Sequence, residues 1–357
     1  MDTKLVKAVN SQRLNLLCSH GGIELLPEIC LRVTELLIDS DSKAVGRLQL
    51  ASKSFFALIK FHEKSVTKTV SKNYHNFEIV NGSEKFVFSF HHGLDIEELE
   101  RYTYPWVSEM KFRKTIVEFL VKHEITEMAG TIDGDSSKIA GWPSLNVCKK
   151  ELQFKLNWFK SRALFLLFRL SDSVTGLYTT DTIRDQQSKF LHSLSTKELA
   201  FIGVMVEVMG HNFFIITKRT MLKYNPAQSN SHESSRSNSV SENQAGAISD
   251  LNDNWIRETM CVFEDLVQRY GPYFAWAYLE GSRDRLSKSS QWARCKIREG
   301  IANMNAFELG YTMSYASLQS VVWRAFRQKQ GCGSASTWNF AKGLVEKEMK
   351  VCPNDVY

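Results

Sequence analysis

The stretch that decides the fold is Leu25-Leu26-Pro27-Glu28-Ile29-Cys30-Leu31-Arg32-Val33-Thr34-Glu35-Leu36-Leu37. Pro27 suits the first turn of a helix, where its missing N–H costs nothing, and Glu28 suits the positive end of the helix dipole. The apolar side chains that follow recur at helical spacing and predict one stripe, formed by Ile29, Val33, Leu36 and Leu37. A helix with an apolar face is therefore expected to begin at Pro27.

Two more short helices are predicted after this one. They follow Asp39-Ser40-Asp41-Ser42, whose side-chain oxygens can cap a helix, and Ala51-Ser52. The second helix carries Val45 and Leu48, and the third carries Phe55, Leu58 and Ile59. Gly46, inside the second helix, costs about 1 kcal/mol relative to alanine. Three helices make a module of about 40 residues, which rarely stabilises itself, so part of its apolar surface is expected to lie in an interface.

This module resembles the F-box. The F-box opens with Leu-Pro-x-Glu-Ile, continues through an Asp-bearing turn, and closes with Ser-Lys-x-Phe-x-x-Leu. The chain has Leu26-Pro27-Glu28-Ile29, Asp41 and Ser52-Lys53-Ser54-Phe55-Phe56-Ala57-Leu58 at these places. The resemblance implies that a Skp-type adaptor, and through it a cullin, is bound by residues that face or support the adaptor: Leu26, Pro27, Ile29, Val33, Leu36, Leu37, Val45 and Leu48.

The rest of the chain resembles the helical C-terminal region of ascomycete F-box proteins. It contains Leu194-Ser195-Thr196-Lys197-Glu198-Leu199-Ala200 and, later, Glu264-Asp265-Leu266-Val267-Gln268-Arg269-Tyr270-Gly271-Pro272-Tyr273-Phe274-Ala275-Trp276-Ala277. Gly271-Pro272 should end one helix and redirect the next. The aromatic side chains Phe274, Trp276 and Tyr278 then either pack in a core or form a partner surface.

The predicted fold is mainly α, with a small F-box module followed by a larger helical domain. Residues 1–21 are expected to be a flexible lead-in, 22–74 the F-box and 76–350 the helical domain. Within that domain, the Ser- and Asn-rich residues 225–253 are too polar to bury a core and are predicted to be a disordered insertion.

Helical patterns are predicted over residues 96–125, 145–170, 196–217 and 254–270, and Ser195 with Glu198 has the spacing of a capping box. A hairpin is predicted across Asn81-Gly82, between residues 77–80 and 86–90, from the turn type and the alternation. The apolar stretch 199–217 is interrupted by Glu207, His211 and Asn212, so it is interpreted as a buried helix and no membrane association is expected.

Composition is typical of a globular protein, and the cysteine content favours the cytoplasm or the nucleus. A net charge of +6 in 357 residues is too small to indicate nucleic-acid binding, and the basic residues near Trp323 are interpreted as the solvated face of a helix. The seven cysteines are scattered and are expected to be reduced thiols.

No catalytic or cofactor site is predicted. The chain has no GxSxG, P-loop, GxGxxG or HExxH motif, so common hydrolase, nucleotide-binding and zinc-protease chemistries have no support. Asp39-Ser40-Asp41, Asp133-Gly134-Asp135 and His91-His92 lack the further ligands of a metal site and are interpreted as turns or surface residues.

The F-box resemblance implies a substrate-recognition subunit of a Skp–cullin–F-box ubiquitin ligase, in which the ubiquitin chemistry belongs to other subunits and the bound client is an unidentified protein. Two alternatives remain open. The chain is either a scaffold that binds the adaptor without directing degradation, or a helical enzyme whose site is not visible in the sequence.

Overall fold

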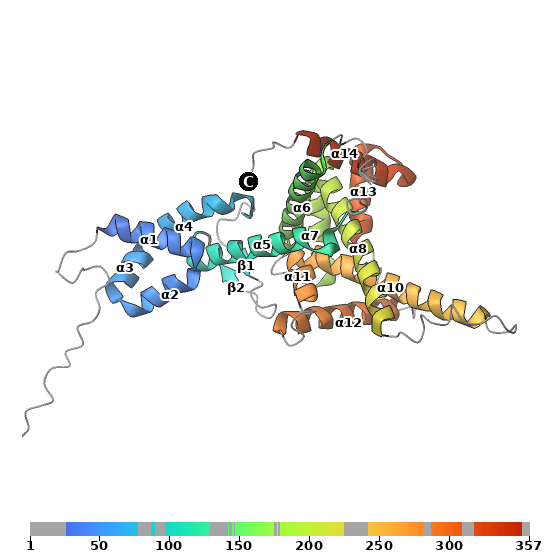
Figure 1. Ribbon diagram of the computed structural model, residues 1–357, viewed down its shortest axis with the longest axis horizontal. Helices are drawn as coiled ribbons and strands as arrows, with labels where there is room; N and C mark the ends of the chain where they lie inside the picture. Colours follow the sequence, from blue (N-terminus) through green and yellow to red (C-terminus); the bar gives the residue numbers. More distant parts are fainter. Residues whose placement is uncertain are drawn as a thin grey trace, which may run out of the picture. The chain divides into compact units, whose positions relative to one another are not determined.

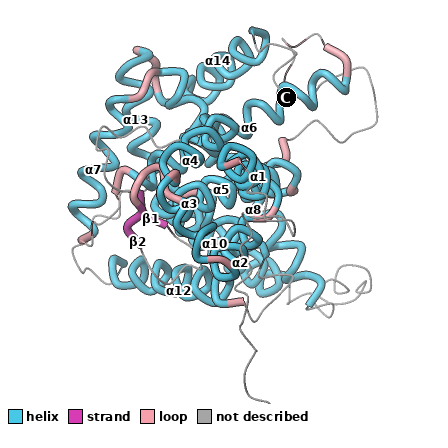
Figure 2. The backbone as a smooth tube through the Cα atoms, turned by 90° about the vertical axis from the view of Figure 1, so that its left-hand side faces the viewer, coloured by secondary structure: helices cyan, strands magenta, loops and turns pink. Residues whose placement is uncertain are grey.

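A computed structural model describes residues 26–77, 87–89, 97–128, 142, 145, 147–174, 177, 179–224, 242–280, 287–308 and 318–351. Among them the fold is helical apart from one short pair of strands (Figures 1 and 2). The chain divides into two compact units. Of the described residues, those up to residue 112 belong to unit 1 and those from residue 113 onward to unit 2.

Unit 1 begins with four short helices and a 3-10 turn, which are α1 (Pro27–Ser40), α2 (Ser42–Ala51), α3 (Lys53–Phe61), α4 (Glu63–Ser71) and η1 (Lys72–Phe77). The predicted start of α1 is confirmed, with Pro27 in its first turn, and the helix ends where Asp41 turns to an extended backbone. Ser52 caps α3, because its side chain accepts a hydrogen bond from Phe55 N at 3.3 Å. The third predicted helix is divided at His62 into two helices, α3 and α4.

The core of unit 1 needs more than the three predicted helices. Its buried side chains come from α1, α2 and α3, but also from α4, η1 and the first half of α5 (Tyr104–Lys122). They are Cys30, Ile38, Val45, Phe55, Ile59, Val66, Val70, Tyr74, Trp106, Val107 and Met110. The predicted module boundary near residue 74 therefore differs from the compact unit, which continues into α5 to Phe112.

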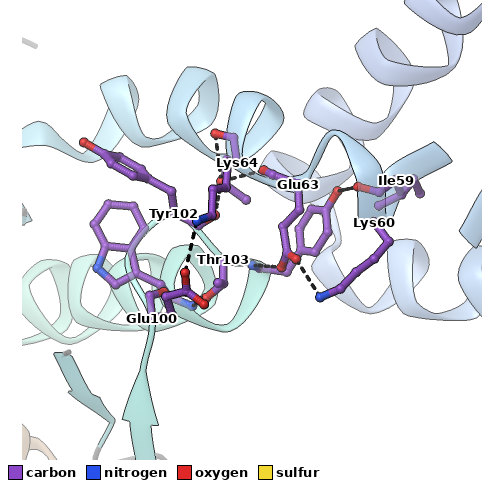
Figure 3. A network of polar contacts seen from close by, with 10 residues as sticks. Ile59, Lys60, Glu63, Lys64, Glu100, Tyr102 and Thr103 are labelled. Carbon is purple, nitrogen blue, oxygen red and sulfur yellow. Dashed lines mark hydrogen bonds and ion pairs between the residues drawn. The ribbon is translucent and has the colours of Figure 1, made fainter. Parts of the chain in front are cut away.

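A polar network joins the start of α4 to the start of α5 (Figure 3). The buried carboxylate of Glu63 accepts a hydrogen bond from Tyr104 N at 2.9 Å and another from Lys60 Nζ at 2.9 Å. Thr67 Oγ1 donates to Tyr102 O at 2.7 Å, and Tyr104 OH donates to Ile59 O at 3.2 Å. Glu63 thus satisfies a backbone N–H that the first turn of a helix leaves without a partner inside the helix.

The backbone just before α5 adopts an uncommon conformation at Tyr102. Tyr102 has a φ of 62°, which is uncommon for a residue with a side chain. Its ring packs edge-on against Trp106 at 5.2 Å and lies beneath the guanidinium of Arg101 at 4.8 Å. The ring contacts and the Thr67 hydrogen bond hold the backbone in this conformation.

The short strands pair differently from the predicted hairpin. Strand β1 (Val87–Ser89) pairs in antiparallel fashion with β2 (Glu97–Leu99), with Val87 opposite Leu99. Phe77 lies in η1, and residues 78–86, including Asn81-Gly82, lie outside the described residues. The prediction of a strand at residues 87–89 is confirmed, whereas its pairing with residues 97–99 was not predicted. Residues 78–80, the predicted partner strand, lie outside the described residues.

Unit 2 consists of the second half of α5 and the helices that follow it. These are η3 (Glu124–Thr126), α6 (Lys149–Asp172), α7 (Thr180–Ser193), α8 (Thr196–Tyr224), α10 (Glu242–Tyr270), α11 (Pro272–Glu280), α12 (Lys288–Glu308), α13 (Leu318–Gln330), η5 (Ser334–Ser336) and α14 (Thr337–Val351). Helix α8 packs against α6, α10, α13 and α14 and forms the centre of this unit.

Glycines in α8 permit close helix packing. A Cβ at Gly203 would lie 2.4 Å from the ring of Trp323 in α13, and one at Gly210 would overlap the carboxylate of Glu264 in α10. By length and composition, α8 can cross a membrane over Thr196–Thr220, but 61% of its most apolar window is buried against the rest of the fold. Core helices of soluble proteins have the same properties.

Several predicted element boundaries need correction. The helix predicted over residues 96–125 begins at Tyr104, because residues 97–99 pair in β2 instead. The helix predicted over residues 254–270 begins earlier, at Glu242. Helix α10 therefore includes residues 242–253 of the predicted disordered insertion, where Glu, Gln, Ala and Leu favour a helix. The rest of the predicted insertion, residues 225–241, lies outside the described residues.

We expect Glu63→Ala to lower the free energy of unfolding of unit 1 by about 1–3 kcal/mol, because a partly buried backbone N–H at the start of α5 loses its acceptor. Glu63→Gln should cost less, since its amide oxygen can still accept from Tyr104 N. Hydrogen exchange of peptides that cover α1 to α4 measures the effect. The exposed Glu118 on α5 provides the control variant Glu118→Ala, and equal protection in Glu63→Ala and this control would contradict the expected role.

Candidate docking surface

The outer face of α1 exposes a stripe of large apolar side chains, which we call the α1 stripe. It consists of Leu26, Ile29, Val33 and Leu36, whose exposed fractions are 62%, 48%, 45% and 56%. Their spacing of three, four and three residues places them on one side of the helix. Pro27 is also exposed at the start of this helix.

The opposite side of α1 is buried in unit 1. Cys30, Thr34 and Ile38 pack inside, and the Thr34 hydroxyl is satisfied because it donates to Cys30 O at 2.8 Å. Leu37, which the sequence places in the same stripe as Ile29, is half-buried against this core. Helix α1 thus has two apolar sides, one used within unit 1 and one facing solvent.

The two adaptor-contact residues predicted in α2 have different surroundings. Val45 is buried in the core of unit 1, so it can support the surface but cannot face a partner. Leu48 is half-buried and packs against the same core. Sequence spacing alone does not separate these residues from the exposed ones, because the pattern marks apolar positions without showing which neighbour covers them.

The C-terminal end of α1 is fixed by residues that the sequence analysis did not identify. Lys111 Nζ donates to Ile38 O and Asp39 O, each at 2.7 Å, so its charge lies at the negative end of the α1 dipole. Tyr74 OH donates to the Asp39 carboxylate at 2.5 Å. These contacts join residues 35 to 73 positions apart, and no local pattern signals them.

Unit 1 also exposes apolar side chains on α2 and α3 that were not predicted as site residues. Leu50 and Phe61 are almost fully exposed, and Phe56 is about half exposed. Phe55, the neighbour of Phe56 in α3, is buried, because adjacent residues of a helix point in different directions. The exposed apolar surface of unit 1 is therefore larger than the predicted set.

The predicted partner surface in unit 2 is corrected in part. Phe274 is completely buried, with its ring 5.9 Å from that of Phe263 and 5.8 Å from that of Trp292, so it belongs to the core. Trp276 and Tyr278 are half-buried, and burial raises the pKa of Tyr278. Gly271, with a φ of 70°, separates α10 from α11 as expected.

The interior of unit 2 holds paired charges. Arg113 and Asp172 form two hydrogen bonds of 2.8 and 2.9 Å, and both side chains are buried. Arg184 pairs with Asp265, and Gln187 donates to Gln268 O at 3.1 Å. Each of these contacts joins two different helices. The two ion pairs therefore link helices within unit 2.

Among the described carboxyl groups, that of the buried Glu264 has the most strongly shifted pKa. Burial raises the pKa of its carboxyl group to about 8, and the charge of Glu207 adds to this effect. Its side chain lies against Gly210, where any larger residue would occupy the same space. The group is therefore mostly protonated at neutral pH.

The described residues contain no group of three His, Cys, Asp or Glu side chains that could hold a metal ion. Asp39 and Asp41, considered as ligands in the sequence, instead accept hydrogen bonds from Tyr74 and Arg47. His91-His92 and Asp133-Gly134-Asp135 lie outside the described residues. Five described cysteines, Cys30, Cys148, Cys261, Cys295 and Cys332, are free thiols.

Comparison with known proteins finds no match to a family model, to a curated protein or to a solved structure.

We expect Gly46→Ala to raise the free energy of unfolding of unit 1 by about 0.5–1 kcal/mol, because alanine is the better helix former and a Cβ at this position meets no atom within 4 Å. Gly271→Ala should destabilise unit 2, since its φ is positive and a Cβ would lie 2.7 Å from Ser171 Oγ. Thermal unfolding measures the stability change in both variants, and hydrogen exchange shows in which unit it occurs. A loss of stability in Gly46→Ala would show that its surroundings are tighter than the structure indicates.

We expect the stability of unit 2 to fall as pH rises from about 4.5 to about 8. Over this range folded Glu264 keeps its proton while the unfolded chain loses it, so the folded state binds more protons. Glu264→Gln should remove this slope and, at pH 8, make the protein more stable than the parent by on the order of 3 kcal/mol. Denaturant unfolding at several pH values tests this, with the exposed Glu118→Gln as control. An unchanged slope in Glu264→Gln would refute the assignment.

Proposed function

We propose that the chain is an F-box substrate-recognition subunit of a Skp–cullin–F-box ubiquitin ligase. The observation that carries the proposal is the exposed α1 stripe on a helix whose other side is already buried in unit 1. A soluble protein rarely leaves such a row of large apolar side chains in water unless a partner covers it.

The positions of the F-box-like motifs support the same proposal. Leu26-Pro27-Glu28-Ile29 lies at the start of α1, where Leu26 and Ile29 belong to the exposed stripe. The closing motif begins with Ser52, which caps α3, and continues with Phe55, which packs in the core. One motif thus supplies contact residues, and the other holds the helices that present them.

The role of unit 2 in this proposal is to bind the client protein. Its helices bury an extensive core of their own, so it is an independent body able to carry a recognition surface. Half-buried Trp276 and Tyr278 are the members of the predicted surface that remain available for such contacts. The ubiquitin chemistry would belong to other subunits of the ligase, and this chain would need no catalytic residues of its own.

We expect the double variant Ile29→Glu/Leu36→Glu to bind a purified Skp-type adaptor at least about 100-fold more weakly than the parent, because two apolar contacts are replaced by charges that must be desolvated. Both residues are exposed, so the fold should be retained. Phe340→Glu on α14 is the matched control, since Phe340 is 47% exposed. Titration calorimetry measures binding, and circular dichroism checks the fold.

Adaptor binding that is equal in the parent, the double variant and the Phe340→Glu control would refute the docking role of the α1 stripe. Binding that is lost only in the double variant supports it. Ubiquitination of client proteins, compared in cells with and without the chain, then separates a ligase subunit from a scaffold that only assembles with the adaptor.

A further inference from the structure

Helix α7 is held in unit 2 by few apolar side chains. Among its described side chains, only Ile183, Gln187 and Leu191 are buried, and their spacing of four residues places them on one side of the helix. Two of these side chains are apolar and the third is an amide. Helix α6, by comparison, buries half of its 24 residues. A helix with so little buried apolar surface belongs to the parts of a fold that open most easily.

Polar contacts supply much of the remaining attachment of α7. Arg184 pairs with Asp265 of α10, and the side chain of Asp265 is 5% exposed whereas that of Arg184 is 24% exposed. One turn later, Gln187 Nε2 donates to Gln268 O at 3.1 Å. At its C-terminal end, α7 is held by Lys329 of α13, which donates to a carbonyl group of the last turn. We call the two residues of α10, Asp265 and Gln268, the α7-binding surface.

Helix α7 does not satisfy this surface completely. The side chains of Gln187 and Gln268 are completely buried, yet among the described residues no donor reaches Gln187 Oε1 or Gln268 Oε1. A buried amide oxygen without a donor costs free energy, which a partner with a further N–H group at this position would recover. Helix α7 is therefore an imperfect occupant of the surface that it covers.

The residues of α7 show which kind of segment fits the surface. Asp265 receives a guanidinium, Gln268 O receives a side-chain N–H group three residues later, and Leu191 is buried four residues after that. A second helix with arginine, a donor and leucine at the same spacing would make the same contacts. With lysine or arginine as the donor it would carry more N–H groups than glutamine does, and could also satisfy the buried amide oxygen of Gln268.

We infer that α7 is a displaceable helix and that the α7-binding surface is the client site of unit 2, where a client helix with the pattern Arg-x-x-donor-x-x-x-Leu takes the place of α7. This inference rests on the proposed function, since it names the kind of client segment that the recognition subunit binds. It also gives α7 an autoinhibitory role, because the site is covered until α7 opens.

Hydrogen exchange of the full-length chain tests whether α7 opens on its own. Amides of α7 should exchange at least about 100-fold faster than those in the first half of α8, at the centre of unit 2. Arg184→Ala should speed exchange in α7 by at least about 10-fold and leave α8 unchanged, because the buried Asp265 loses the guanidinium of Arg184. Arg324→Ala, at an exposed arginine of α13, is the matched control. Exchange in α7 that is no faster than in α8 would overturn the opening.

A peptide tests whether the surface accepts a helix from another molecule. The probe is a fluorescently labelled synthetic peptide of residues 179–194, and its binding is followed by fluorescence anisotropy. It should bind the Arg184→Ala chain at least about 10-fold more tightly than the parent chain, whose intact α7 competes at a high effective concentration. The same peptide carrying Arg184→Glu is the control and should not bind, because it brings a carboxylate to Asp265.

The outcomes separate this inference from the proposed function. Equal binding of the two peptides to the Arg184→Ala chain would overturn the client site, and so would an absence of binding by both. Adaptor binding at the α1 stripe is measured separately, so the proposed function stands if only the peptide result is negative. If the chain does not bind the adaptor, the proposed function fails, whereas hydrogen exchange and the peptide still decide whether α7 can be displaced.

Discussion

The hydrogen bond from Tyr104 N to the buried carboxylate of Glu63 is the contact on which unit 1 depends. It joins the start of α4 to the start of α5 and thereby places Trp106 and Met110 inside the unit. Those side chains complete a core that the three predicted helices are too small to form alone. With that core complete, the inner side of α1 is covered and its outer stripe remains exposed.

Side chains that cap the ends of other helices recur through both units. In each case a lysine from one helix donates to carbonyl groups at or near the last turn of another, where the negative end of the helix dipole lies. The four lysines are Lys111 for α1, Lys160 for α5, Lys329 for α7 and Lys155 for α14. Burial lowers the pKa of Lys160 to about 8, so this arrangement stabilises a helix end while also carrying a desolvation cost.

The helical class, the start of α1 and three of the four members of its predicted stripe, Ile29, Val33 and Leu36, follow from local spacing. The fourth predicted member, Leu37, is half-buried, and Leu26 was predicted only through the F-box resemblance. Other features depend on residues distant in the chain. Periodicity marks Val45 and Phe274 as apolar but does not show that neighbouring helices cover them. The β1–β2 pairing and the N-terminal extension of α10 were missed because composition alone does not decide which partner a strand finds or how far a packed helix continues.

Helix α5 belongs to both units, since the division falls between Phe112 and Arg113 within one continuous helix. A fragment cut at the end of η1 would lose Trp106, Val107 and Met110 from its own interior. The remaining fragment would instead expose those three side chains to water. Dissection of this protein at the edge of its sequence motif would therefore produce two pieces prone to aggregation, and the shortest fragment that keeps the core of unit 1 intact must include the first two turns of α5.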